Sequence, residues 1–236
     1  MKAVLLIAVN FVREQRWPIL VLLLWVLLLA FLGLVSNVTK QREDLLFIFK
    51  QVAVYIVAFS VFFGGSAIYN ERKTRRILAV LSKAIGRQQY LSGLVLGVTI
   101  ASGIYCFALG LTGSWTLGFA GFPMAHVWYL MLSLVAACML AGTIALMFST
   151  FLNPFFAAGA TAAVLGIPAV MAHTTASSWA YVIPVYTLTT QVMKATFEAP
   201  GRANWLAIGL AIAETILFWI LSARIFSYVD IAVAVE

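Results

Sequence analysis

The 236-residue sequence is 64% hydrophobic and only 10% charged, with a mean hydropathy of +1.03. Soluble globular domains carry roughly 25% charged residues, so this chain has too little polar sequence to cover a soluble domain, and we expect an integral membrane protein. The formal net charge of +7 does not by itself indicate a nucleic-acid partner, because in a membrane protein the positions of basic residues set the topology.

Residues 1–17 predict an amphipathic helix that lies in the headgroup plane. Its apolar residues at helical spacing are Leu5, Val9 and Val12, and basic residues gather toward its C-terminal end. The alternative is that these residues simply extend the first span into the cytosol. The Trp17-Pro18 step predicts a bend before the first span, because the residue preceding a proline disfavours the α conformation.

Six segments are candidates for transmembrane helices, which need about 20 mostly apolar residues each. Five are long, namely residues 18–36, 45–69, 91–119, 125–150 and 205–226, and a shorter sixth, residues 155–172, is rich in glycine and alanine. The pattern therefore predicts an all-α membrane protein with six transmembrane helices, forming one transmembrane domain over residues 1–236. An even number of crossings places both termini on the same side.

The distribution of Lys and Arg predicts which side that is. The side that holds the termini carries about ten basic residues and the opposite side about five. Cytoplasmic loops carry the excess of Lys and Arg, so we expect both termini in the cytoplasm and the protein in the inner (plasma) membrane.

Residues 70–90 form a cytoplasmic segment with an unusual charge. It holds six basic residues against one acidic residue, Glu71, and an apolar patch lies in its middle, at Ile77, Leu78, Val80 and Leu81. This layout is typical of a short helix that docks by its apolar face into a groove on another protein. A positively charged anchor bound to anionic lipid is the alternative.

Glu71, Leu78, Leu81, Ser82 and Arg87 follow the pattern Glu-x6-Leu-x2-Leu-Ser-x4-Arg. With the N-terminal helix, two spans before this segment and four after it, the chain resembles a permease subunit of ABC-2-type ABC transporters. The resemblance implies an ABC-2 permease-like bundle in which this segment is the coupling helix that fits a cleft on the ATP-binding subunit. The implied coupling residues are Glu71, Arg72, Arg75, Arg76, Leu78, Leu81, Ser82 and Arg87.

The energy source is expected on a separate polypeptide. ATP hydrolysis needs a phosphate-binding loop of the form G-x-x-x-x-G-K-[ST], and no Gly-Lys pair occurs in the sequence. We therefore expect no cofactor in this chain and no enzymatic activity of its own, with ATP and Mg bound by the partner ATPase subunits. The resemblance further implies export, and pairing with a second copy or a homologous permease.

The candidate gate residues and the candidate residue of the transport path lie in the second half of the chain. We expect substrate to cross at the dimer interface, lined by the first, second and fifth spans. The external segment, residues 173–204, is a candidate gate with Pro184 and Tyr186. Glu214 lies near the middle of the last span, where an ionisable group is a functional candidate by default; the alternative is a neutral or hydrogen-bonded carboxyl group, with Thr143 or Ser149 as partner.

Two other classes of protein stay open. A stand-alone, proton-coupled secondary transporter would use Glu214 as its proton carrier, although such proteins usually show internal repeats and none is evident. An intramembrane enzyme is disfavoured because H-E-x-x-H is absent and the aspartates, Asp44 and Asp230, lie at span ends. No metal site is expected from His126 and His173, which lack a cluster of further ligands.

Overall fold

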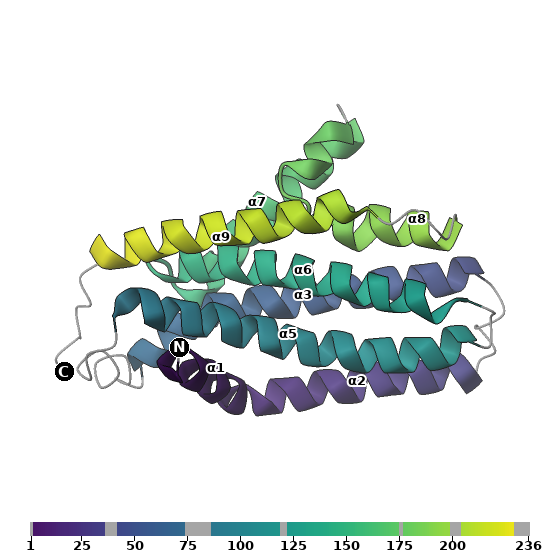
Figure 1. The fold of residues 1–236 in the computed structure, drawn as a ribbon, viewed down its shortest axis with the longest axis horizontal. Helices are drawn as coiled ribbons and strands as arrows, with labels where there is room; N and C mark the ends of the chain where they lie inside the picture. The colour runs from purple at the N-terminus through teal and green to yellow at the C-terminus, as the bar shows by residue number, and fades with distance from the viewer. Residues whose placement is uncertain are drawn as a thin grey trace.

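The computed structural model describes residues 2–35, 42–73, 86–118, 122–174, 177–198 and 204–228. Every regular element within these ranges is a helix. Most of the long helices lie side by side along one direction (Figure 1). The predicted all-α architecture is confirmed for the described part of the chain.

Within the described ranges, seven helices of 13 to 32 residues form most of the structure. They are α1 (Lys2–Glu14), α2 (Arg16–Val35), α3 (Arg42–Lys73), α5 (Arg87–Gly118), α6 (Met124–Ser149), α7 (Pro154–Thr174) and α9 (Trp205–Tyr228). A shorter helix, α8 (Val192–Glu198), a 3-10 turn, η2 (Ser177–Tyr181), and a π-helical turn, η3 (Thr187–Gln191), lie between α7 and α9.

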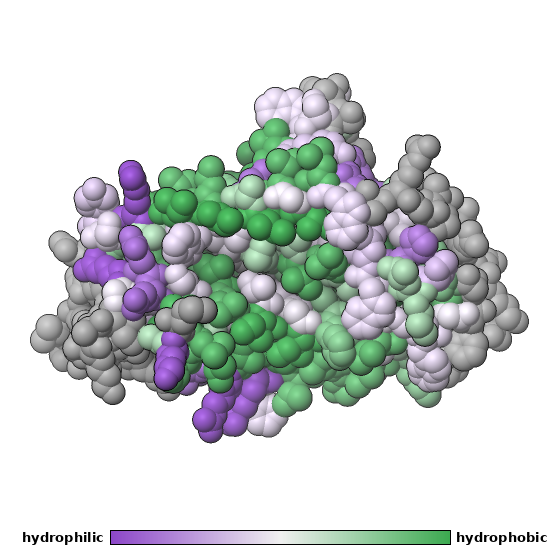
Figure 2. Space-filling model, in the orientation of Figure 1, coloured by the Kyte–Doolittle hydropathy of each residue, from purple (hydrophilic) through white to green (hydrophobic). Residues whose placement is uncertain are grey.

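These helices make the chain a multi-pass membrane protein. Five of them, α3, α5, α6, α7 and α9, are long and apolar enough to cross a membrane, and the bent pair of α1 and α2 raises the number to as many as six. Each of the six predicted spans coincides with one of the helices α2, α3, α5, α6, α7 and α9. Figure 2 shows the corresponding apolar surface across the middle of the molecule, with hydrophilic residues toward its ends.

The bend between α1 and α2 lies earlier than predicted. The two helix axes meet at 63° around Gln15, and α2 begins at Arg16, so Trp17 and Pro18 are already helical. The prediction of a bend at Trp17-Pro18 was therefore wrong in position. Proline is tolerated in the first turn of a helix because the missing amide proton has no intrahelical acceptor there.

The centre of the bundle is the crossing of α3 and α6, where two glycines face each other. A Cβ atom at Gly64 would collide with the carbonyl oxygen of Gly142, and a Cβ atom at Gly142 would lie 2.7 Å from Ser60 Oγ. Small residues let transmembrane helices approach closely, which favours van der Waals packing and interhelical hydrogen bonds. The spacing Ser60-x-x-x-Gly64 on α3 thus meets Cys138-x-x-x-Gly142 on α6.

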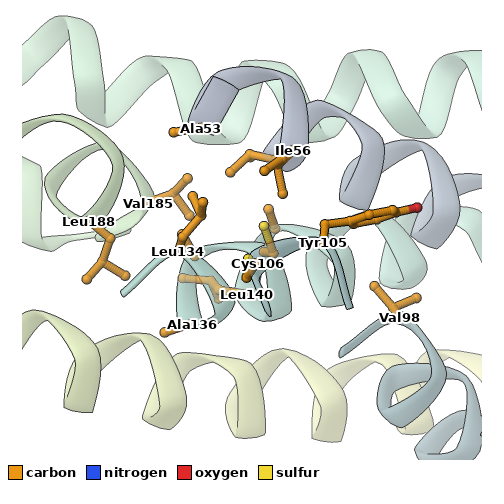
Figure 3. Packing of buried hydrophobic residues seen from close by; sticks show 14 of the residues in the cluster. Ala53, Ile56, Val98, Tyr105, Cys106, Leu134, Ala136, Leu140, Val185 and Leu188 are labelled. Carbon is orange, nitrogen blue, oxygen red and sulfur yellow. The ribbon is translucent and has the colours of Figure 1, made fainter. Parts of the chain in front are cut away.

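A short chain of hydrogen bonds joins three helices at this crossing. Ser102 Oγ of α5 donates to Ser60 Oγ at 3.4 Å, and Ser60 Oγ donates to the carbonyl oxygen of Cys138 at 2.6 Å. Cys138 and Cys106 are free and buried, and Figure 3 shows Cys106 among the apolar side chains of the core. Each interhelical hydrogen bond in a membrane contributes about 0.6–2 kcal/mol, so this chain pins the register of α3, α5 and α6.

A second pair of glycines holds α1 on α5. A Cβ atom at Gly93 would lie 2.6 Å from Ile7 Cβ, and one at Gly97 would lie 2.8 Å from the ring of Phe11. Gly93 and Gly97 form a G-x-x-x-G in the predicted third span, a spacing that predicts close helix packing, and the structure confirms this packing. The N-terminal helix is therefore docked on the start of α5, and the α1 end of the bundle is also the end at which α9 finishes (Figure 1).

The close contact of Gly64 and Gly142 predicts that a larger side chain at Gly64 destabilises the protein. We expect Gly64→Ala to lower the free energy of unfolding by about 1–3 kcal/mol, because the added methyl group meets backbone that cannot rotate away. The matched control is Gly103→Ala on α5, where a Cβ atom meets nothing within 4 Å. Denaturant titration of both variants in detergent micelles, followed by circular dichroism, measures the difference; equal stabilities would contradict the assignment.

Candidate functional site

The predicted coupling segment grows out of two long helices. Glu71 and Arg72 belong to the last turn of α3, and Arg87 is the first residue of α5. The helices therefore extend four residues into each end of the predicted 70–90 loop. The other predicted coupling residues, Arg75, Arg76, Leu78, Leu81 and Ser82, fall within residues 74–85, which lie outside the described part of the chain.

Arg87 connects the start of α5 to the end of α9. Its Nη1 donates hydrogen bonds to the carbonyl oxygens of Phe226 and Ser227, each at 2.9 Å, and its guanidinium carbon lies 5.8 Å from the ring centre of Phe226. Tyr90, one turn further along α5, stacks on the same ring. The last carbonyls of a helix lack intrahelical partners and a cation there is favoured by the helix dipole, so Arg87 caps α9.

An apolar groove with a volume of about 360 Å³ lies between α2 and α3. Its lining residues are Val21, Leu22, Leu24, Trp25 and Leu28 of α2, with Tyr55 and Phe59 of α3. The first and second predicted spans thus form a surface that suits an apolar ligand. Helix α7, the fifth predicted span, lines no part of this groove and packs against α6, η2 and α3 instead.

Glu214 lies on the side of α9 that carries the buried residues Ala211 and Thr215, and its side chain is partly buried. Its Oε2 atom has no hydrogen-bond partner among the described residues. Thr143 and Ser149, the partners considered from the sequence, donate to carbonyl oxygens of their own helix, those of Met139 and Leu146. The structure therefore gives no support to a hydrogen bond between either hydroxyl group and Oε2.

Within the predicted external segment, residues 185–198 form one short helix that packs on the bundle. Pro184 is buried at its start and accepts a hydrogen bond from the amide of Leu188 at 2.8 Å, while Tyr186 is half-buried in its first turn. Figure 3 shows Val185 and Leu188 beside Leu134 of α6 in the buried core. The predicted gate residues thus lie at the start of a helix that packs on α3 and α6. This helix contains the π-helical turn η3, and π-helical turns are frequent at functional sites.

Asn204 connects the residues before α9 to Tyr129 of α6 and Tyr181 of η2, and sequence reasoning missed it. Its amide donates to Tyr129 Oη at 2.6 Å, its Nδ2 donates to Tyr181 Oη at 3.0 Å, and its Oδ1 accepts from the amide of Ala207 at 3.3 Å. Asparagine directly before a helix is a recognisable N-cap signal, but its two tyrosine partners, 75 and 23 residues away, leave no trace in local sequence.

No three His, Cys, Asp or Glu residues gather into a metal-binding group anywhere in the described ranges. His126 lies edge-on to Phe122 instead. The apolar groove between α2 and α3 suits an apolar ligand.

Comparisons of the chain with models of protein families, with curated proteins and with solved structures return no match.

The Arg87 cap can be tested directly. We expect Arg87→Ala to free the last turn of α9 at a cost of about 1.5–3 kcal/mol, the range for hydrogen bonds to charged groups, and Arg87→Lys to retain part of the effect. Hydrogen exchange followed by mass spectrometry should then show faster exchange at residues 226–228. Arg224→Ala, an exposed arginine on the same helix, is the control; unchanged exchange in the Arg87 variants would contradict the cap.

Proposed function

We propose that this chain is the transmembrane permease subunit of an ABC-2-type ABC transporter, an exporter driven by ATP hydrolysis on separate cytoplasmic subunits. The observation that carries the proposal is the attachment of the basic segment. Residues 74–86 connect α3 directly to α5, and Arg87, where α5 begins, is hydrogen-bonded to the end of α9. A protein that binds this segment is therefore connected to three long helices, α3, α5 and α9.

The contacts of α5 make it a suitable lever. It packs against α1, α2, α3, α6 and α9, and its contact with α1 is the close one at Gly93 and Gly97. Rigid-body movement of packed helices around an interface is an established form of conformational switching. Closure of two ATPase subunits on ATP would move the segments of two permease copies and rock the bundles between inward-open and outward-open states.

The length of α3 supports the same proposal. Its 32 residues extend about 48 Å at 1.5 Å per residue, whereas the hydrocarbon core of a bilayer is about 30 Å thick. Its charged end, Glu71, Arg72 and Lys73, thus projects beyond the apolar run that ends at Tyr69. On the proposed topology this end lies in the cytoplasm of the cell, within reach of a soluble partner.

A proton-coupled secondary transporter is the second candidate, and one observation favours it. Oε2 of Glu214 lacks a hydrogen-bond partner among the described residues, as a proton carrier would. The two functions are distinguished by reconstituting the purified chain alone: proton uptake into vesicles that is lost in Glu214→Gln would support the secondary transporter and contradict the dependence on an ATPase.

The coupling assignment predicts the loss of a partner. We expect the double variant Arg75→Glu and Arg76→Glu to recover at least about tenfold less ATPase when the tagged chain is purified from its native membranes, since like charges at an interface cost several kcal/mol. The ATPase is identified by mass spectrometry as a polypeptide with a G-x-x-x-x-G-K-[ST] loop, and is quantified by ATP hydrolysis of the eluted complex.

The matched control reverses two other arginines at the same end of the bundle. Arg13 and Arg224 are both exposed and lie outside the segment, so Arg13→Glu with Arg224→Glu makes the same change in formal charge. This variant should retain the ATPase. Equal losses in both double variants, or a wild-type chain that retains no such ATPase, would overturn the proposal.

A further inference from the structure

The junction of α1 and α2 leaves basic and apolar groups exposed together. Helix α1 uses the side that carries Ile7 and Phe11 to dock on α5. Leu5 and Val9 are exposed and, at 3.6 residues per turn, lie on the side away from this contact. Lys2 and Arg13, also exposed, form the next stripe around the helix.

The acidic and amide groups of α1 lie further round. Asn10 donates a hydrogen bond to Glu14 at 3.1 Å on the exposed surface. The order around the helix is the docked face, the apolar stripe, the basic stripe with the exposed Leu6 beside it, and the polar stripe. A helix at a membrane surface places its apolar stripe toward the acyl chains and its basic stripe among the headgroups.

Trp17 continues this pattern onto α2 and leads into the α2–α3 groove. Trp17 is exposed, and the residues that follow it on the same side of the helix at i+4, i+7 and i+11 are Val21, Leu24 and Leu28, all of which line the groove. The guanidinium carbon of Arg16 lies 5.8 Å from the Trp17 ring centre. A cation and an interfacial tryptophan thus stand where the apolar groove begins.

We propose that this junction and groove bind one anionic phospholipid from the leaflet at the α1 end of the bundle. Its phosphate is held by Arg13 and Arg16, its glycerol region lies at Trp17, and one acyl chain follows the groove past Leu24 and Leu28. The charge complementarity is specific: guanidinium groups match phosphate oxygens in paired hydrogen bonds, tryptophan favours the headgroup level, and the lining of the groove carries no charge.

The lipid is the occupant that the surroundings of the groove favour. The groove opens on the apolar surface of a chain that crosses the membrane, where acyl chains are the neighbouring molecules. Figure 2 shows hydrophilic surface at the α1–α2 junction directly bordering the apolar band. The inference needs only that the chain lies in a membrane, so it stands or falls separately from the proposed transport function.

Native mass spectrometry of the purified chain in detergent, titrated with palmitoyl-oleoyl phosphatidylglycerol or phosphatidylcholine, tests the proposal. The wild-type chain should bind phosphatidylglycerol more tightly. Arg13→Gln with Arg16→Gln should weaken that binding roughly 25-fold, about fivefold for each basic residue near a headgroup, and leave phosphatidylcholine binding unchanged. Leu24→Trp, which fills the groove, should weaken the binding of both lipids.

Matched controls exist for each change. Arg224→Gln removes an exposed arginine at the same end, and Leu206→Trp enlarges a leucine that is 67% exposed, against 66% for Leu24; neither should alter binding. Equal affinity of the wild-type chain for the two lipids overturns the proposal without recourse to any variant. Undiminished lipid binding by Leu24→Trp would show that the acyl chain does not lie in the groove. A dimer that forms only without added lipid would show that a second copy of the chain occupies the groove.

Discussion

The close approach of α3 and α6 is the constraint on which the rest of the bundle depends. In a bilayer the lipid tails are as apolar as leucine, so helices associate through packing and interhelical hydrogen bonds. Gly64 and Gly142 bring the two backbones together, and this proximity lets Ser60 reach the carbonyl oxygen of Cys138. Helix α6 then becomes the most buried of the membrane-spanning helices, with α5 and α9 packed on its other sides.

Helix α2 shows the opposite condition and thereby creates the groove. It packs chiefly on α5 and makes few contacts with α1. Apolar grooves flank it on both sides, one toward α3 and one, lined by residues such as Phe31 and Trp115, toward α5. Its large exposed side chains are compatible only with a lipid or protein environment. The helix that carries the strongest apolar signal in the sequence thus keeps many of its large apolar side chains exposed.

The sequence predicted the helices well because a membrane-spanning helix needs a long apolar run. Each of the six predicted segments matches a helix, with ends that agree within four residues, and five or as many as six of these helices are long and apolar enough to cross a membrane. It also predicted the use of Gly93 and Gly97, although not that their partner would be the N-terminal helix. The Ser60/Gly64 and Cys138/Gly142 spacings of small residues can be recognised in the sequence, but no local pattern predicts that these two pairs contact each other. The groove and the Asn204 contacts depend on residues that are distant in sequence. The bend was predicted at Trp17-Pro18 and lies around Gln15, because a proline in the first turn of a helix does not interrupt it.

The contacts suggest how a pull on residues 74–86 would reach the groove. Such a pull acts on the start of α5, and α5 carries α1 with it through Gly93 and Gly97. Helix α1 is joined to α2 at the bend around Gln15, so movement of α1 displaces the Trp17 end of α2, a helix that makes few close contacts with α3. The α3–α6 crossing resists the same movement because its backbones cannot slide without collision at Gly142. On the proposed function, a force on residues 74–86 would therefore move α2 relative to the rigid α3–α6 crossing and change the width of the α2–α3 groove.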